Sequence, residues 1–259
     1  MIGFTTSGVL IRRIDYGDYD YILTFLTLDR GKMSVIAKNA KKSVKRFLGT
    51  LELFSLLEIT CQYKTRSGIA VLKEAFIEEP FEGIRTDMLK TAYASYWAEL
   101  ISLFLEERVS QNRLFRLLVY ALSALDSRDI SPHQLSLLFQ IRFLNMLGLT
   151  PHFESCGKCR RELERFTQLK IRFDLEKGVI MCDNCATEIK HGRVLSKGTI
   201  KQLIWLQNGD FQITERIRCS VSTTAEGLNF LEAFVPFHTG ASPRSLSVLR
   251  RIRRDLVDT

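Results

Sequence analysis

Four of the six cysteines stand in two Cys-x-x-Cys pairs, Cys156 with Cys159 and Cys182 with Cys185. The pairs are separated by 22 residues. That gap is slightly longer than the roughly 15 to 20 usual in this class of zinc site, and it has room for a hairpin. Zinc needs only two tight turns that bring four thiolates into a tetrahedron. Because four thiolates close the coordination shell, we expect one structural Zn2+ ion and no metal-dependent catalysis.

Two other interpretations of these cysteines stay open. They could be buried or reactive thiols without a metal, or they could hold an iron–sulfur cluster, which also accepts four cysteines. Gly157 and Asn184 suit the two turns, because both residue types tolerate a left-handed backbone. Cys61 and Cys219 lie in strand-like runs and are expected in the core. His191 is not needed, because the ligand set is already complete.

A second feature is a concentration of positive charge. Between Arg30 and Arg66 there are nine Lys or Arg and two Glu, and the acid-free run KNAKKSVKR holds five of the cations. Such cations can hold phosphates by releasing counterions, while Phe47 beside them is a candidate for stacking on bases. The alternative is a merely solvated loop. The candidate nucleic-acid-binding residues here are Lys38, Lys41, Lys42, Lys45 and Arg46, with Arg30, Lys32, Arg12 and Arg13 around them.

A further basic cluster lies near the end of the chain. Its members are Arg244, Arg250, Arg251, Arg253 and Arg254. Helical spacing spreads these side chains over several faces, so phosphate binding and ordinary solvation are equally compatible with the pattern. Neither basic cluster has the features of direct base reading, and we expect weak sequence preference.

The elements that must position these residues begin with a β-rich segment. Apolar and β-branched residues separated by turn-like stretches predict five short strands in the first 80 residues, at 5–14, 19–28, 33–38, 51–63 and 69–77. Five strands in this length suit a small closed barrel, either an OB-fold or an SH3-like barrel. The basic run follows the third strand, next to a face where OB-folds commonly bind oligonucleotides.

Helical spacing takes over after Pro80. It predicts helices at 85–106, 112–127, 197–206, 224–237 and 245–256, and another from Ser131 as N-cap to a stop at Gly148. The helix that begins after Ser131 is apolar on nearly all sides and is expected to be central. We therefore predict an α+β multidomain protein. Residues 1–80 form a five-stranded OB-fold β-barrel, and residues 81–259 form an all-α C-terminal domain with a four-cysteine, zinc-ribbon-like insert at 151–193.

The overall composition limits the partners. The chain of 259 residues carries a net charge of +8 and has a pI near 9.2, which points to a polyanion, either nucleic acid or an acidic membrane surface. No apolar run is long enough to span a bilayer. The N-terminal stretch lacks the charge order and cleavage site of a secretory signal, so we expect a cytoplasmic, nucleoid-associated protein with reduced thiols.

The sequence contains no Walker-type phosphate loop, dinucleotide glycine motif or His-Glu-x-x-His pattern. Asp15, Asp18 and Asp20 cluster near the start, and such carboxylates bind magnesium in some nucleases. A solvated hairpin explains the same cluster, and we do not expect an enzyme.

Several stretches resemble the RecO family of bacterial recombination and repair proteins. The run GVLIRRIDYGDYDYILTFLTLDRGKMSVIAKNAKKSVKRFLGTLELFS has the family's order of strand, acidic turn, strand, glycine turn and basic loop. RFLNMLGLTPHFESCGKC and GVIMCDNC resemble its two cysteine knuckles, and SPRS at 242–245 resembles a short motif near its C-terminus. Asn39 stands where the family commonly has glycine, and Asn can adopt the same left-handed conformation.

This resemblance implies an OB-fold, a helical domain and a zinc-ribbon-like element. It also implies binding to single- and double-stranded DNA, annealing of complementary strands and, with RecR, help for RecA in replacing single-strand binding protein (SSB). Contact with the SSB C-terminal tail is implied by the family alone, since Leu137 and Leu138 stand where some members have a basic pair. The alternative function is a zinc-ribbon transcription or RNA-binding module without annealing activity.

Overall fold

The computed structural model describes residues 2–43, 46–63, 68–127, 130–209, 219–240 and 242–256. Contacts divide the chain into two compact units, 1–129 with 243–259, and 130–242. This division differs from the predicted boundary at residue 80, because helices after that residue contact the barrel. The domain boundary at residue 80 stays a prediction.

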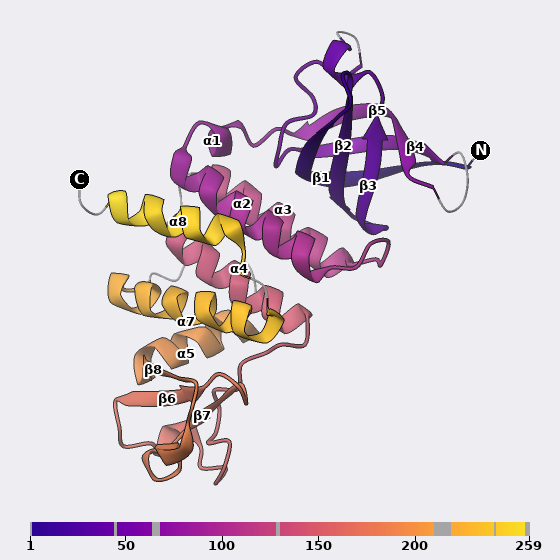
Figure 1. The fold of residues 1–259 in the computed structure, drawn as a ribbon. Helices are drawn as coiled ribbons and strands as arrows, with labels where there is room; N and C mark the ends of the chain where they lie inside the picture. Colours follow the sequence, from indigo (N-terminus) through magenta and orange to yellow (C-terminus); the bar gives the residue numbers. More distant parts are fainter. Residues whose placement is uncertain are drawn as a thin grey trace. The chain divides into compact units, whose positions relative to one another are not determined.

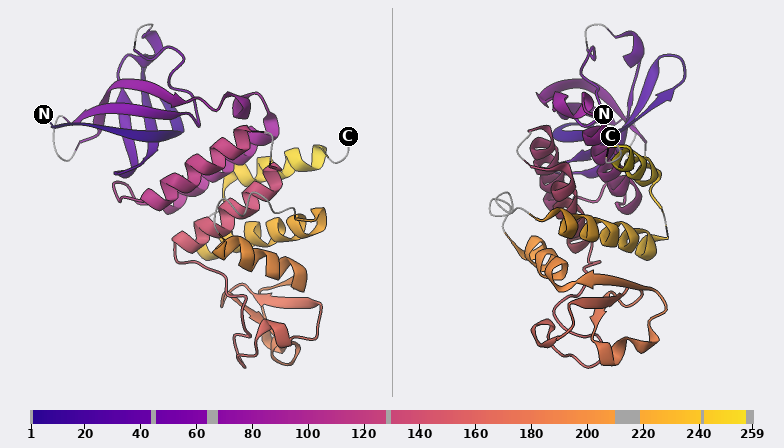
Figure 2. Two further views of the ribbon diagram at one scale, coloured as in Figure 1. Left: turned by 180° about the vertical axis from the view of Figure 1, so that it is seen from behind. Right: turned by 90° about the vertical axis from the view of Figure 1, so that its left-hand side faces the viewer.

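The N-terminal segment is a closed five-stranded barrel with the strand order β1-β2-β3-β5-β4 (Figure 1, Figure 2). Neighbouring strands are antiparallel except β3 and β5, which pair in parallel and close the barrel. This is the predicted OB-fold. The strands are β1 (Ile2–Tyr16), β2 (Asp20–Thr27), β3 (Gly31–Ala37), β4 (Leu56–Tyr63) and β5 (Ala70–Glu79).

Alternating side chains fill the barrel. Along β3 the residues alternate between buried and half-buried, as expected when one face of a strand lines a core. Leu10, Leu23, Phe25 and Val35 are fully buried at its centre. The predicted fourth strand began too early, since β4 starts only at Leu56.

Among its described residues, the first unit also contains the helices α1 (Glu82–Arg85), α2 (Met88–Phe104), α3 (Asn112–Asp126) and α8 (Arg244–Asp255). The predicted helix at 85–106 began too early, because the carboxylate of Asp87 caps α2 by accepting hydrogen bonds from the N–H groups of Leu89 and Lys90 at 2.8 and 3.0 Å. Leu103 lies on the solvent side of α2 and is 48% exposed. Tyr96 and Trp97 lie on its core side and are fully buried.

Helix α8 packs along α2, although the two are far apart in sequence (Figure 1). Its N-terminus is capped by Glu99 of α2, whose carboxylate accepts hydrogen bonds from the N–H groups of Arg244 and Ser245 at 3.0 and 2.8 Å and from the Ser245 hydroxyl. Burial raises the pKa of Glu99, but these hydrogen bonds and the charge of Arg244 outweigh burial and hold it below its ordinary value of 4.5.

Replacing Glu99 by Gln should lower the free energy of unfolding by about 1 kcal/mol at pH 7, the usual size of a helix-cap effect. A depressed carboxylate pKa stabilises the folded state above the unfolded pKa, and this contribution is lost as pH falls through the folded value. The difference between wild type and Glu99→Gln should therefore close below pH 4.5. Urea unfolding at pH 7 and pH 3 measures it, with exposed Glu106→Gln as the control; equal stabilities at pH 7 would show that the cap does not matter.

The second unit is built on α4 (Pro132–Met146), which contacts both α5 (Lys197–Asn208) and α7 (Val221–Thr239). Every residue from Leu135 to Leu144 is buried, so the prediction of a central helix is confirmed. A side-chain carbon at Gly227 of α7 would come within 2.8 Å of Leu137, which explains the glycine. Pro132 begins α4 as predicted, but Ser131 makes no side-chain cap bond. Gly148 is left-handed after the helix, with φ 74°.

The cysteine-containing element carries a three-stranded antiparallel sheet with the order β7-β6-β8. Its strands are β6 (Lys170–Asp174), β7 (Val179–Met181) and β8 (Gly192–Ser196), with short 3-10 helices η2 (Leu163–Arg165) and η3 (Asp183–Glu188). Gly178 lies in the turn between β6 and β7 in the left-handed conformation, with φ 66°. Ile171 and Phe173 of β6 are buried, whereas Leu169 lies before this strand and is 78% exposed.

Phe173 anchors this sheet to α7. Its ring meets those of Phe230 and Phe234 at centroid distances of 4.8 and 5.9 Å, and Phe153 lies 5.5 Å from Phe173. These four rings are all buried. Aromatic contacts of this kind stabilise beyond the area that they bury. Across the described ranges, no helix combines the length and apolar character that crossing a bilayer requires.

Candidate metal centre and basic surface

The first cysteine turn is closed by backbone hydrogen bonds. The N–H of Cys156 donates to the Arg161 carbonyl at 2.8 Å, and the N–H of Arg160 donates to the Cys156 carbonyl at 3.0 Å. Arg160 has the left-handed conformation, with φ 61°. Gly157 does not have positive φ, so the prediction that it provides the left-handed residue is wrong. A side-chain carbon at Gly157 would lie 2.4 Å from Val179 of β7, and close packing therefore explains this glycine.

The second turn follows β7 directly. Cys182 is the N-cap residue of η3, and the Cys185 N–H donates to the Cys182 carbonyl at 2.9 Å. Asn184 is helical in this turn, not left-handed as predicted. The two turns are joined by a bond from the Gly157 N–H to the Ile180 carbonyl at 2.9 Å. The hairpin that the long gap predicted is the β6–β7 pair.

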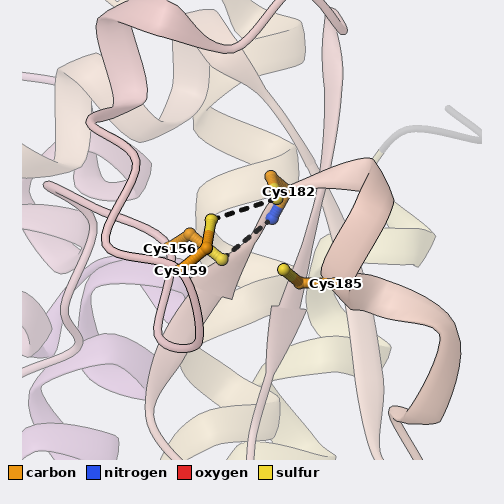
Figure 3. Close-up of side chains that lie close together, drawn as sticks. All are labelled: Cys156, Cys159, Cys182 and Cys185. Atoms are coloured by element: carbon orange, nitrogen blue, oxygen red, sulfur yellow. Dashed lines mark hydrogen bonds between the residues drawn. The ribbon is translucent and has the colours of Figure 1, made fainter.

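The four cysteine side chains converge between these turns (Figure 3). All four sulfur atoms lie within 4.8 Å of one another, and the Sγ atoms of Cys159 and Cys182 are 3.6 Å apart. Four sulfurs held 2.3 Å from one tetrahedral ion would be about 3.8 Å from each other. The cluster therefore fits a single metal ion with only small movements.

The protonation of the cluster also favours a cation. Burial raises the pKa of Cys156, but hydrogen bonds from backbone N–H groups of both turns outweigh burial and lower it to about 6. The hydrogen bond with Cys182 raises the pKa of Cys185 to about 12, and burial raises that of Cys182. One thiolate thus forms readily and its neighbours resist ionisation. A bound dication would stabilise the deprotonated form of all four thiols, because metal ligands must be thiolates.

The other two cysteines lie outside this cluster. Cys61 is fully buried in the barrel core, and burial raises its pKa to about 12. The prediction of a core residue is confirmed there. Cys219 is half-buried and precedes the N-cap residue of α7, so it does not lie in a strand. Among the described residues, the four cysteines alone form a group of potential metal ligands.

The basic run after β3 folds as a short 3-10 helix, η1 (Ala40–Lys42), on the β1–β2 hairpin. Asn39 starts it in the left-handed conformation, with φ 55°, as expected for a residue in the place of glycine. Its N–H donates to Asp20 at 2.7 Å, and the Lys41 N–H donates to the Tyr19 carbonyl at 3.0 Å. The run is thus a shaped segment of the barrel.

The cations of this run differ in how far they are engaged. The Lys41 ammonium group pairs with Asp15 at 3.4 Å and donates to the Gly17 carbonyl at 3.2 Å. Lys42 lies 3.6 Å from the centre of the Tyr19 ring. Arg46 donates to the Lys38 carbonyl at 3.0 Å. The Lys38 side chain is exposed without a polar partner in the described part of the chain. Lys45 lies outside the described residues.

Phe47 does not have the exposure that stacking on bases requires. It is 4% exposed and belongs to the barrel core, with Arg46 over its ring at 4.9 Å. The prediction that Phe47 is available to nucleic acid is therefore wrong. The aromatic rings near these cations are Tyr19 and Tyr21 of the hairpin. The sequence carried their signal in the run YGDYDY, which we interpreted only as an acidic turn.

The flanking cations of the barrel are engaged elsewhere, except one. Arg13 donates to the Leu51 carbonyl at 2.6 Å, and Arg30 lies 4.0 Å from the centre of the Phe4 ring. Lys32 donates to the Ser102 carbonyl of α2 at 2.7 Å, and burial lowers its pKa, with Glu107 opposing the shift. Arg12 is exposed. These positions leave Arg12 as the flanking cation best placed for an added ligand.

Helix α8 carries the C-terminal arginines. Leu246, Leu249 and Ile252 form its buried stripe. The exposed arginines are Arg244, Arg250, Arg251 and Arg254, while Arg253 lies 6.0 Å from the centre of the Tyr93 ring. The spread over several faces agrees with the sequence interpretation. The SPRS motif has a structural role, because its last two residues are those that Glu99 caps.

The acidic residues of the hairpin do not form a metal site in the described structure. Asp15 pairs with Lys41, and Asp20 accepts the hydrogen bond from Asn39. Both carboxylates therefore fasten η1 to the barrel. Leu137 and Leu138, at 0% and 4% exposure, are core residues of α4.

Comparison with known proteins covers nearly the whole chain. The family described as "Recombination protein O N terminal" matches residues 1–81, and "Recombination protein O C terminal" matches residues 85–247. The chain is 42% identical over 251 residues to the DNA repair protein RecO of Desulfatibacillum aliphaticivorans, which covers 96% of this chain and 97% of the relative. The RecO of Desulfosudis oleivorans is 41% identical over 98% of this chain and 99% of its own. That of Syntrophus aciditrophicus is 32% identical over 96% of each.

Proposed function

Because the chain belongs to the RecO family of DNA repair proteins, we propose that it is a recombination mediator that binds single- and double-stranded DNA and anneals complementary strands. In this proposal it acts with RecR to help load RecA on DNA covered by SSB, whose C-terminal tail it contacts. It works without nucleotide hydrolysis or strand cleavage. Its place of action is the cytoplasm, at the nucleoid.

The observation that carries this proposal is the basic segment Lys38–Arg46 on an OB-fold barrel. Hydrogen bonds and an ion pair hold η1 against the hairpin, while Lys38, Lys42 and Arg46 remain exposed. Cations fixed in this way can follow a phosphate backbone and leave the base edges available for pairing. Arg12 on β1 is a further exposed cation of the barrel. The arginines of α8, Arg244, Arg250 and Arg251, are a second candidate surface for DNA.

The metal in this proposal is one structural zinc ion held by Cys156, Cys159, Cys182 and Cys185. Four sulfur ligands in a tetrahedral group suit zinc, and a closed shell offers no position for a reacting water. The ion supports the two turns and takes no part in handling DNA.

Annealing of complementary strands coated with SSB, measured with and without RecR, tests this proposal. The protein should accelerate duplex formation. When RecA is supplied, adding RecR should increase the amount of RecA loaded on the SSB-coated strand. A protein that binds DNA but leaves the annealing rate unchanged would instead fit a nucleic-acid-binding module without mediator activity. In the same reaction with magnesium, the strands should stay intact, because Asp15 and Asp20 serve the fold.

A further inference from the structure

The tip of the β1–β2 hairpin exposes aromatic side chains. Tyr16 is 53% exposed and Tyr19 is 42% exposed. Tyr16 ends β1 opposite Asp20, the first residue of β2, and Gly17 makes the turn with φ 57°. The rings of Phe25 and Phe47, in contrast, fill the barrel core. Two exposed tyrosines at one tip therefore call for an explanation.

Tyr19 and the turn next to Tyr16 contact the cations of η1. The Lys41 N–H donates to the Tyr19 carbonyl at 3.0 Å, and the Lys41 ammonium group donates to the Gly17 carbonyl at 3.2 Å. Lys42 lies over the Tyr19 ring at 3.6 Å, yet that ring remains 42% exposed. The hairpin and η1 are thus fastened together, and the Tyr19 ring and the Lys42 charge reach solvent side by side.

The combination has a recognised chemical use. Aromatic rings beside a basic track bind single-stranded nucleic acid, because each base has a π-face that stacks and each phosphate has a charge that pairs. Phe76 illustrates the contrast, since it is 58% exposed on β5 opposite Glu58, on a strand that also carries Glu74 and Glu78.

We propose that Tyr16 and Tyr19 form a stacking platform for unpaired bases of single-stranded DNA, while Lys42 and its neighbours hold the backbone. This inference rests on the proposed DNA binding and assigns it a strand preference. Stacking uses the faces of a base and leaves its pairing edge open. A strand held in this way stays ready for annealing.

The test compares three labelled probes by fluorescence anisotropy with the full-length protein. These are a thymidine 20-mer, an abasic 20-mer with the same phosphates, and a 20-base-pair duplex. Wild type should bind the thymidine strand more tightly than the abasic strand. Tyr16→Leu with Tyr19→Leu should weaken binding to the thymidine strand by roughly tenfold for each ring, within the range for base stacking on an aromatic side chain. Binding to the abasic strand and to the duplex should change less than about twofold, since the cations remain.

Two further variants guard the interpretation. Tyr16→Phe with Tyr19→Phe keeps both rings and should bind as wild type. Phe76→Leu removes an exposed ring on β5, which is distant in sequence from the cations of η1. This variant should bind all three probes as wild type does. If the double leucine variant retains wild-type preference for bases over abasic sites, the platform is overturned although DNA binding stands. If wild type binds none of the three probes, the proposed function itself fails.

Discussion

Neutralising the exposed cations of the basic run, with Lys38→Gln, Lys42→Gln and Arg46→Gln combined, should weaken DNA binding by as much as roughly 100-fold at 0.1 M salt. Each cation that contacts a phosphate contributes about 0.9 to the slope of log affinity against log salt for duplex DNA, and about 0.7 for a single strand. With three cations removed, the slope should become less steep by up to about 2.7 for duplex DNA and up to about 2.1 for a single strand. Lys41 is left in place because its bonds to Asp15 and Gly17 hold η1 on the hairpin.

A matched control removes the same number of charges elsewhere in the first unit. Lys73→Gln on β5 with Arg113→Gln and Arg116→Gln on α3 replaces three exposed cations outside the basic run. Titrations at several salt concentrations compare the two variants. Equal losses would show that net charge, not the surface at η1, governs binding. Unchanged affinity in the first variant would direct attention to Arg244, Arg250 and Arg251 of α8.

The barrel could be predicted because apolar and β-branched runs separated by turn residues are a local signal. Only β3 also alternates along its whole length, whereas β2 is buried continuously from Leu23 to Thr27. The early start assigned to β4 has the same origin. Leu51 and Phe54 are buried as in a strand, but Phe54 is left-handed with φ 72°. They belong to a loop that packs against the barrel, and periodicity does not distinguish the two.

Contacts between distant residues were beyond the sequence. Glu99 caps α8 from a position 145 residues before Arg244, and no local pattern marks a carboxylate for that task. The burial of Phe47 was also beyond the sequence. An aromatic residue beside cations has the same local pattern whether it fills a core or faces solvent, and only the closed barrel shows which of the two it does. Phe47 is buried, whereas Tyr16 and Tyr19 of the hairpin are exposed.

The cysteine site was more predictable, because its spacing alone favours two turns that bring four sulfur atoms together. The reasons for individual residues were still different from those expected. Gly157 is required by the side chain of Val179, and Arg160 supplies the left-handed residue. The fold also shows a second support that spacing does not reveal. Phe173 holds β6 to α7 through Phe230 and Phe234, independently of any ion.

Replacing Cys159 by Ser should abolish stoichiometric zinc and loosen the two turns without unfolding the second unit. Structural zinc commonly contributes on the order of 10 kcal/mol to the small elements that it holds, and few apolar contacts replace it at the exposed first turn. Amide hydrogen exchange should therefore accelerate at 154–165 and 182–188. It should remain slow in β6 and α7, because the buried rings of Phe153, Phe173 and Phe230 pack together there.

Cys219→Ser is the matched control, since it removes a thiol of the same unit that is not part of the cluster. It should keep one zinc per chain by elemental analysis and the exchange pattern of wild type. DNA affinity should be the same in all three proteins, because the basic surface belongs to the first unit and does not depend on the ion. A Cys159→Ser protein with wild-type zinc content would contradict the ligand assignment. Loss of slow exchange throughout α4 and α7 would show instead that the ion, and not the aromatic cluster, holds the second unit together.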